Sequence, residues 1–164
     1  MEFFVHSLIL LILFLFAGFF SAAETAIFSL SKIQRRRLAD RHPYLARWVL
    51  YHLDHPRRAL ITILTGNLLV NTLSTALATL MAIKYLGPQS LAWVMIAFTL
   101  FLLLFCEITP KVFAVRRNEI SSVLTAFPLH VIAILIWPVR RLARWITDWL
   151  ISFIIKEKKE RPDV

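Results

Sequence analysis

The sequence Thr65-Gly66-Asn67-Leu68-Leu69-Val70-Asn71 places two carboxamides inside the apolar run 59–83. A helix of that length, rising 1.5 Å per residue, crosses a hydrocarbon core of roughly 30 Å. The two carboxamides are four residues apart and therefore share one helix face, which Ser74 and Thr75 continue one turn later. Lipid offers such groups no hydrogen-bond partner. We therefore expect this face to point toward protein, water or a bound cation.

Composition places the chain among integral membrane proteins. Of its 164 residues, 59% are hydrophobic, and the mean hydropathy is +0.69. A soluble domain usually has an apolar share of about 45–50%. The single cysteine, Cys106, excludes an internal disulfide framework. We expect one small helical bundle, occupying residues 1–155, that acts as a membrane domain and not as an enzyme.

The net charge of +9 would suggest nucleic acid as the partner of a soluble protein, but its distribution favours a membrane topology. Of 19 basic residues, eight lie between Lys32 and Arg58 and ten lie from Lys111 onward, while Lys84 stands alone on the second loop. The positive-inside rule then places the N-terminus outside and the C-terminus in the cytoplasm. We expect a multi-pass protein of the cell inner (plasma) membrane that contacts the lipid bilayer and no nucleic acid.

The first apolar run could be mistaken for a secretory signal, because Ser21-Ala22-Ala23 is similar to a cleavage site. Its N-terminal flank, however, carries Glu2 and no Lys or Arg, and the run is longer than a normal signal core. We predict a retained span over about 3–28.

Small and polar residues gather at the inner end of this span. Gly18, Ser21 and Thr25 share one face, which is typical of helix–helix contacts in bilayers. That interpretation does not provide an ion-pair or hydrogen-bond partner for the carboxylate of Glu24.

The region 32–58 is basic and is interrupted by Pro43 and Pro56, which predicts two short helices at the cytoplasmic surface. Arg35-Arg36-Arg37 is interpreted as an orienting and anionic-lipid contact in preference to a specific binding patch. Three histidines have no metal-ligand spacing and are expected at the surface: His42, His52 and His55.

The third predicted span, about 91–113, ends in Cys106-Glu107-Ile108-Thr109-Pro110-Lys111. Pro110 has no N–H, which predicts a helix break that frees the carbonyl of Cys106 beside the carboxylate of Glu107. These two oxygens would be hard ligands at one level. The alternative is that Glu107 pairs with Lys111 at i+4 as an interfacial ion pair.

Depth decides whether the polar groups of the three spans can meet. Counting from the ends of the apolar runs, Ser21, Glu107 and Asn67 lie roughly 3, 6 and 12 Å above the cytoplasmic edge of the hydrocarbon core. All three therefore fall in the inner half of the bilayer, and we expect them to converge.

The last apolar segment, 122–138, is long enough for a fourth span but contains Pro128 and is flanked by basic clusters. Spanning would place one cluster outside, against the charge bias. We predict instead a kinked juxtamembrane belt helix, about 119–155, on the cytoplasmic side, whose second half is amphipathic and interfacial. The charged end 156–164 is expected to begin a linker to a cytosolic domain absent from this chain.

Three motifs together resemble a known family. Phe20-Ser21-Ala22-Ala23-Glu24-Thr25-Ala26, Gly66-Asn67-Leu68-Leu69-Val70-Asn71 and Glu107-Ile108-Thr109-Pro110-Lys111 are similar to the transmembrane domain of the CorC/cyclin-M (CNNM) magnesium transporters, in order over essentially the whole chain. The resemblance implies a homodimer with three spans per chain, short cytoplasmic helices after the first span, and a juxtamembrane belt. It also implies Mg²⁺ efflux driven by inward Na⁺, and cytosolic nucleotide-binding CBS domains that this chain lacks.

The same resemblance implies a cation site formed by Ser21, the Gly66 carbonyl, Asn67, Asn71 and Glu107. Polarity and depth alone lead to the same residues except Gly66, and they do not select Mg²⁺. Oxygen ligands favour a hard cation over zinc or copper. Four further residues are candidates for secondary cation contacts, including any for Na⁺: Glu24, Thr25, Ser74 and Thr75.

Two functions follow as hypotheses. The first is a transporter that exports Mg²⁺ from the cytoplasm, coupled to inward Na⁺, by alternating access around the site between the three spans. The alternative is a membrane anchor and dimerisation module for a cytosolic nucleotide-sensing domain, in which the polar face serves only helix–helix hydrogen bonding.

Overall fold

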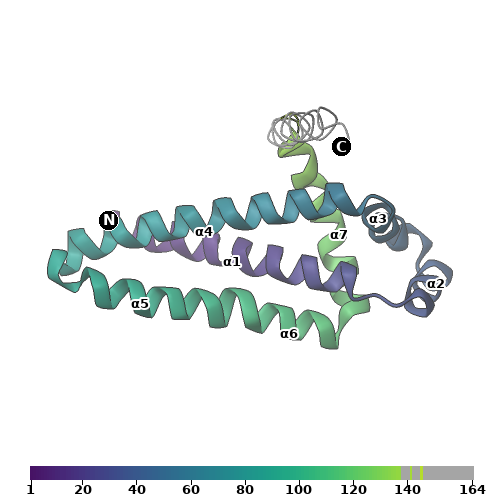
Figure 1. Ribbon diagram of the computed structural model, residues 1–164, viewed down its shortest axis with the longest axis horizontal. Helices are drawn as coiled ribbons and strands as arrows, with labels where there is room; N and C mark the ends of the chain where they lie inside the picture. The colour runs from purple at the N-terminus through teal and green to yellow at the C-terminus, as the bar shows by residue number, and fades with distance from the viewer. Residues whose placement is uncertain (138–140, 142–144, 146–164) are drawn as a thin grey trace, which may run out of the picture.

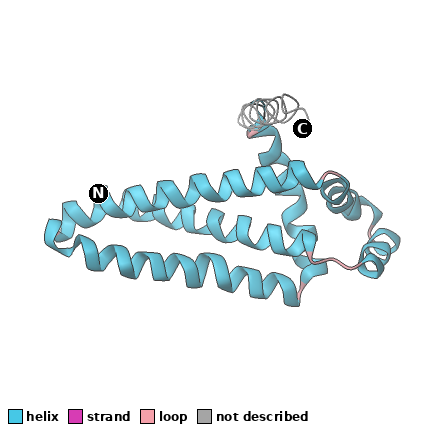
Figure 2. Cartoon of the chain, in the orientation of Figure 1, coloured by secondary structure: helices cyan, strands magenta, loops and turns pink. Residues whose placement is uncertain are grey.

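The computed structural model of the chain describes residues 1–137, 141 and 145. Over these residues the fold is entirely helical and contains no strand (Figure 2). The elements follow in chain order: α1 (Glu2–Phe28), α2 (Lys32–Arg41), α3 (Pro43–Asp54), α4 (Pro56–Leu86), the 3₁₀ turn η1 (Pro88–Ser90), α5 (Leu91–Phe101), the π-helix η2 (Leu102–Ile108), α6 (Thr109–Arg116) and α7 (Asn118–Leu135).

Three long helical rods form the body of the molecule. α1, α4 and the continuous rod α5–η2–α6 run along its longest axis (Figure 1), and α1 packs against both of the others. Gly87, with φ of +85°, makes the turn between α4 and η1 in a region that favours glycine. The expected spans 3–28, 59–83 and 91–113 fall inside these rods.

The two short helices predicted after the first span are confirmed as α2 and α3. Ser31 begins α2 with a capping box: its Oγ accepts from the backbone N–H of Gln34 at 3.2 Å, and its own N–H donates to the Gln34 side chain at 2.9 Å. Pro43 occupies the first turn of α3, where its missing N–H costs nothing. Both helices lie at the end of the bundle opposite the N-terminus.

α7 differs from the other long helices in direction. Four described helices are long and apolar enough to cross a membrane, one more than expected, and α7 is the fourth. Figure 1 shows it running across the three rods instead of along them. It packs against α1, α3, α4 and α6.

The expected belt helix, about 119–155, is described only over its first part. α7 ends at Leu135, and Pro128 lies inside it without ending it. The predicted amphipathic second half, from Arg140 on, lies outside the described residues except for Arg141 and Trp145.

The prediction that His52 is a surface residue is wrong. Its side chain is 2% exposed, and its Nε2 donates to the carbonyl oxygen of Ala126 at 3.0 Å, which joins α3 to α7. The spacing of α3 gave no sign of this, because the burial comes from α7, which is distant in sequence. Burial lowers the pKa of His52 below its usual 6.5, and the nearby rings of His130 and His55 lower it further, while the bond to Ala126 opposes the shift.

Acidification should therefore destabilise the fold through His52. The unfolded chain takes up this proton at a higher pH than the folded one, so stability is lost as the pH falls below about 6.5, by at most about 1.4 kcal/mol per pH unit for one group. Thermal unfolding of the detergent-solubilised protein between pH 7.5 and 5.5 measures this. His52→Gln should flatten the pH slope and the exposed-site control His42→Gln should not; equal slopes for wild type and His52→Gln would contradict the account.

Candidate cation site between three helices

A hydrogen bond joins α1 to the π-helix. Ser21 is 1% exposed, and its hydroxyl donates to the backbone carbonyl of Glu107 at 2.9 Å. One turn away on α1, a Cβ placed on Gly18 would lie 3.5 Å from Cγ of Pro110, which is ordinary contact. Small residues on α1 thus let it approach the third rod closely.

α1 meets α4 at the same level. The Phe20 ring lies over Gly66, so closely that a Cβ on Gly66 would lie 2.3 Å from Cζ of Phe20. Only glycine permits this packing. Adjacent residues of α1, Phe20 and Ser21, therefore contact α4 and η2 respectively.

Asn67 follows Gly66 and carries an unsatisfied oxygen. Its Oδ1 is buried and has no hydrogen-bond partner among the described residues. An unpaired buried acceptor costs about 1–3 kcal/mol, so such groups are rare unless water or an ion satisfies them. This carbonyl oxygen is chemically suited to receive a cation.

The α4–α5 hairpin places Asn67 and Glu107 at matching heights. Thr79 on α4 donates to the sulfur of Met95 on α5 at 3.5 Å. Asn67 lies twelve residues before Thr79, about 18 Å at α-helical rise, and Glu107 lies twelve residues after Met95, at a slightly shorter distance because η2 is a π-helix. The contacts of Phe20 and Ser21 independently indicate the same level.

The carboxylate of Glu107 is half-buried and forms no ion pair within residues 1–137. Lys111, its expected alternative partner, pairs instead with Glu24 of α1 at 3.3 Å. The alternative of a Glu107–Lys111 ion pair is therefore not observed. Lys111 is instead the ion-pair partner of Glu24, for which the sequence alone indicated none. Because Lys111 and Glu24 are both partly exposed, this pair contributes at most about 1 kcal/mol.

The third rod does not break at Pro110 as predicted. It keeps helical geometry and widens into η2, in which the Thr109 N–H bonds the carbonyl of Leu104, five residues back. The Thr109 hydroxyl donates to the same carbonyl at 2.7 Å. The carbonyl that meets Ser21 is that of Glu107 and not that of Cys106. Single π-turns inside α-helices are frequent at functional sites.

The remaining candidates are less closely gathered. Asn71 and Thr75 line a groove of about 700 Å³ on the surface of α4, and the Thr75 hydroxyl donates to the Asn71 carbonyl at 2.8 Å. Within the described residues, no hydrogen bond joins the Asn71 side chain to α1 or to η2. Ser74 is fully buried, and its hydroxyl lacks a partner among the described residues. Thr25 is half-buried one turn beyond Ser21.

The structure thus joins Ser21 to Glu107 by a hydrogen bond, and the Phe20–Gly66 contact places Gly66 and Asn67 of α4 at about the same level. Within the described residues, no three His, Cys, Asp or Glu side chains gather closely enough to hold a metal. An ion bound here would meet one carboxylate together with amide, hydroxyl and carbonyl oxygens. Such a donor set suits a hard cation.

Comparison with known proteins places this arrangement in a family. Residues 8–164 match the model of the cyclin M transmembrane N-terminal domain. The chain belongs to the cyclin M (CNNM) transmembrane domain family. Its relatives include the UPF0053 inner membrane protein YfjD of Escherichia coli, 31% identical over 84% of this chain, and a chloroplastic DUF21 domain-containing protein of Arabidopsis thaliana, 30% identical over 97%.

A UPF0053 protein of Haemophilus influenzae is 29% identical over 90% of this chain. The cyclin M domain described here spans only 24% of the Arabidopsis relative, 32% of YfjD and 35% of the Haemophilus protein. The family and the apolar helices identify a multi-pass membrane protein.

Gly66→Ala should destabilise the cyclin M domain by about 1–3 kcal/mol, because its Cβ would overlap the Phe20 ring. Gly18→Ala is the matched control, since its Cβ would meet only ordinary contact. Thermal unfolding in detergent compares the two variants. Equal shifts of the unfolding midpoint would show that the Phe20–Gly66 contact does not hold α1 against α4.

Proposed function

We propose that this domain is the membrane part of a transporter that exports Mg²⁺ from the cytoplasm, coupled to inward Na⁺, by alternating access. The observation that carries the proposal is the meeting of three helices at one level, with an unpaired Glu107 carboxylate and an unpartnered Asn67 oxygen. Groups of this kind are costly in a membrane and mark ion pathways.

The donor set supports Mg²⁺ as the cargo. Mg²⁺ prefers octahedral oxygen ligands and keeps several of its waters. Glu107 would supply the one formal charge, and Ser21, Asn67, Asn71 and the Gly66 carbonyl would supply neutral oxygens. Binding by a single charge would be modest, which suits a carrier that must release its ion. Ser74, buried without a described partner, is the best placed of the four candidates for a Na⁺ contact.

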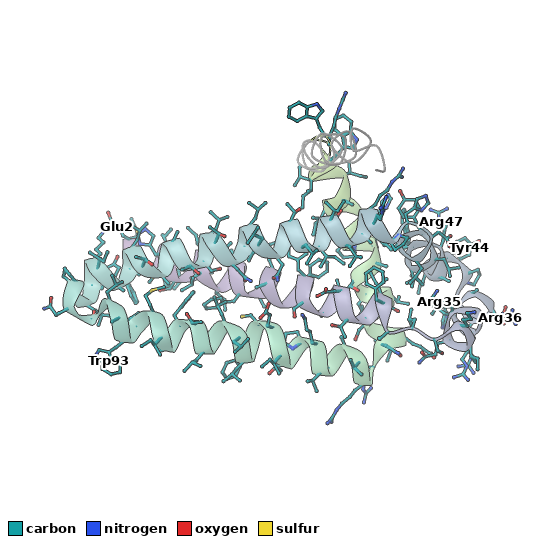
Figure 3. The ribbon with its side chains drawn as sticks, in the orientation of Figure 1. Glu2, Arg35, Arg36, Tyr44, Arg47 and Trp93 are labelled. Carbon is teal, nitrogen blue, oxygen red and sulfur yellow. The ribbon has the colours of Figure 1, made fainter. Side chains whose placement is uncertain are left out.

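The proposed topology has three spans. α1, α4 and α5–η2–α6 cross the bilayer, and α7, which runs across them, stays on the cytoplasmic side. Figure 3 shows Arg35, Arg36 and Arg47 at the α2–α3 end, and Glu2 and Trp93 at the other. The positive-inside rule then places the N-terminus outside and the C-terminus in the cytoplasm. The name of the Escherichia coli relative supports an inner (plasma) membrane location.

We also propose a homodimer. The α4 groove carries Asn71, Thr72, Thr75 and Thr79, and polar groups exposed to hydrocarbon are unfavourable. A second copy would shield this face. Since the chain covers only a quarter to a third of its relatives, cytosolic CBS domains are the proposed partners in a longer protein.

That same short coverage favours the second candidate function, a membrane anchor and dimerisation module for a cytosolic nucleotide-sensing domain. In this role the polar groups would only hold helices together, and each interhelical hydrogen bond would contribute about 0.6 kcal/mol. The two functions differ in whether Mg²⁺ binds to the folded protein and stabilises it.

Asn67→Ala and Glu107→Gln should each abolish Mg²⁺ flux across proteoliposomes while the dimer still forms, because each removes an ion ligand. A Mg²⁺-sensitive dye inside the vesicles measures the flux. Asp54→Asn, an exposed carboxylate at the end of α3, is the control for the loss of charge and should transport normally. Wild-type flux in both site variants would remove the transport proposal.

Millimolar Mg²⁺ should raise the thermal unfolding midpoint of the wild-type domain, because a ligand of the folded state stabilises it by RT ln(1 + [L]/Kd). At ten times the Kd the gain is about 1.4 kcal/mol. Glu107→Gln should lose this shift, whereas Asp54→Asn should keep it. No shift in the wild type, together with weaker dimers in Asn67→Ala, would favour the anchor.

A further inference from the structure

A cavity of about 260 Å³ lies where α2, α3 and the first turns of α7 meet. The helices that line it lie at the end of the bundle where α1 and α6 finish (Figure 1). Nothing in the proposed ion pathway uses it. Its lining combines two guanidinium groups, the Glu119 carboxylate and His42 with apolar side chains.

The charged part of the lining is built on α2. Arg37 and Arg41 are four residues apart and therefore share a face. Arg37 pairs with Glu119 of α7, which also lines the cavity, with 3.8 Å between Nη1 and Oε1. Arg41 is exposed and has no carboxylate partner in the described part of the chain. Two neighbouring guanidiniums match the oxygens of a phosphate group.

The walls of the cavity are fixed before any ligand arrives. The Gln34 side chain of α2 donates to Oδ1 of Asn118, at the start of α7, at 2.9 Å. Nδ2 of Asn118 donates in turn to the carbonyl of Ser29 at 3.3 Å. These bonds hold α2 against α7, so binding would cost little reorganisation.

The apolar part of the lining leads out of the cavity. Leu38 and Val123 lie inside it, and Ile120 and Leu124 are 55% and 67% exposed at its edge. Further exposed apolar residues continue the same face of α7 at helical spacing: Phe127, Val131 and Ile134. An amphiphile with an anionic headgroup could contact both the arginines and this apolar face. A free anion would contact only the arginines, so the surface matches an amphiphile better.

We propose that this cavity binds the headgroup of an anionic phospholipid, with Arg37 and Arg41 on the phosphate and the acyl chains along the outer face of α7. In the proposed topology the cavity lies beside the cytoplasmic ends of α1 and α6, at headgroup depth, where basic side chains attract anionic lipid. The Arg35-Arg36-Arg37 run thus includes one member of a specific site. The site is separate from the cation site, and lipid binding can be measured without Mg²⁺.

Native mass spectrometry of the purified protein, titrated with phosphatidylglycerol against phosphatidylcholine, tests the proposal. Wild type should retain phosphatidylglycerol preferentially, and the double variant Arg37→Gln with Arg41→Gln should bind it about tenfold more weakly or worse. The matched control is Arg36→Gln with Arg57→Gln, which removes the same charge from two exposed arginines that do not line the cavity. It should change the affinity less than about threefold.

Equal losses in the two double variants would overturn the site in favour of diffuse attraction. If the pocket variant does not fold, Arg41→Gln alone, whose side chain has no described partner, should still weaken binding about threefold.

Two further measurements identify the occupant. Excess inorganic phosphate should leave the lipid bound, and displacement would show a free-anion site instead. A photo-crosslinking p-benzoylphenylalanine in place of Leu124 should capture phospholipid. Capture of the chain's own residues 138–164 would show that this segment fills the cavity, and would refute the proposal.

Discussion

The scarcity of hydrogen-bond partners in a bilayer is the constraint on which this structure depends. Every polar group inside an apolar rod must find a partner in protein, water or an ion. Ser21 meets this requirement by donating to the carbonyl of Glu107, and in doing so it fixes α1 against the third rod. Gly66 brings α4 to the same level because it leaves room for Phe20. The need to satisfy polar groups in the bilayer thus holds the helices together and also places several oxygen atoms at one level of the bundle.

What remains unsatisfied at that level is informative. The Asn67 oxygen has no described partner, and the Glu107 carboxylate has no described counter-ion, although Lys111 is only one turn away. Lys111 is committed to Glu24 across the α1–α6 contact. A cation would satisfy both groups at once, whereas a purely structural role leaves a buried acceptor and a charge unexplained.

The sequence predicted most of the fold because the strongest signals are local. Apolar runs of spanning length mark α1, α4 and α5–η2–α6, and Pro43 and Pro56 mark the starts of α3 and α4. Spacing also placed Ser21, Asn67 and Glu107 at similar depth. Spacing cannot, however, identify neighbours from other helices. It therefore offered Lys111 as an alternative partner for Glu107, and it left His52 at the surface. The π-helix was missed because a proline signals a lost bond and not the geometry that replaces it.

The central claim is that oxygens from three helices surround one ion. Its most direct test is an anomalous-scattering experiment on crystals of the domain soaked with Mn²⁺, which replaces Mg²⁺ in oxygen sites. The account predicts a single strong peak inside the membrane region, bounded by Ser21, Asn67 and Glu107. A map without such a peak, in which Asn67 bonds to protein and Glu107 carries a protein counter-ion, would contradict it.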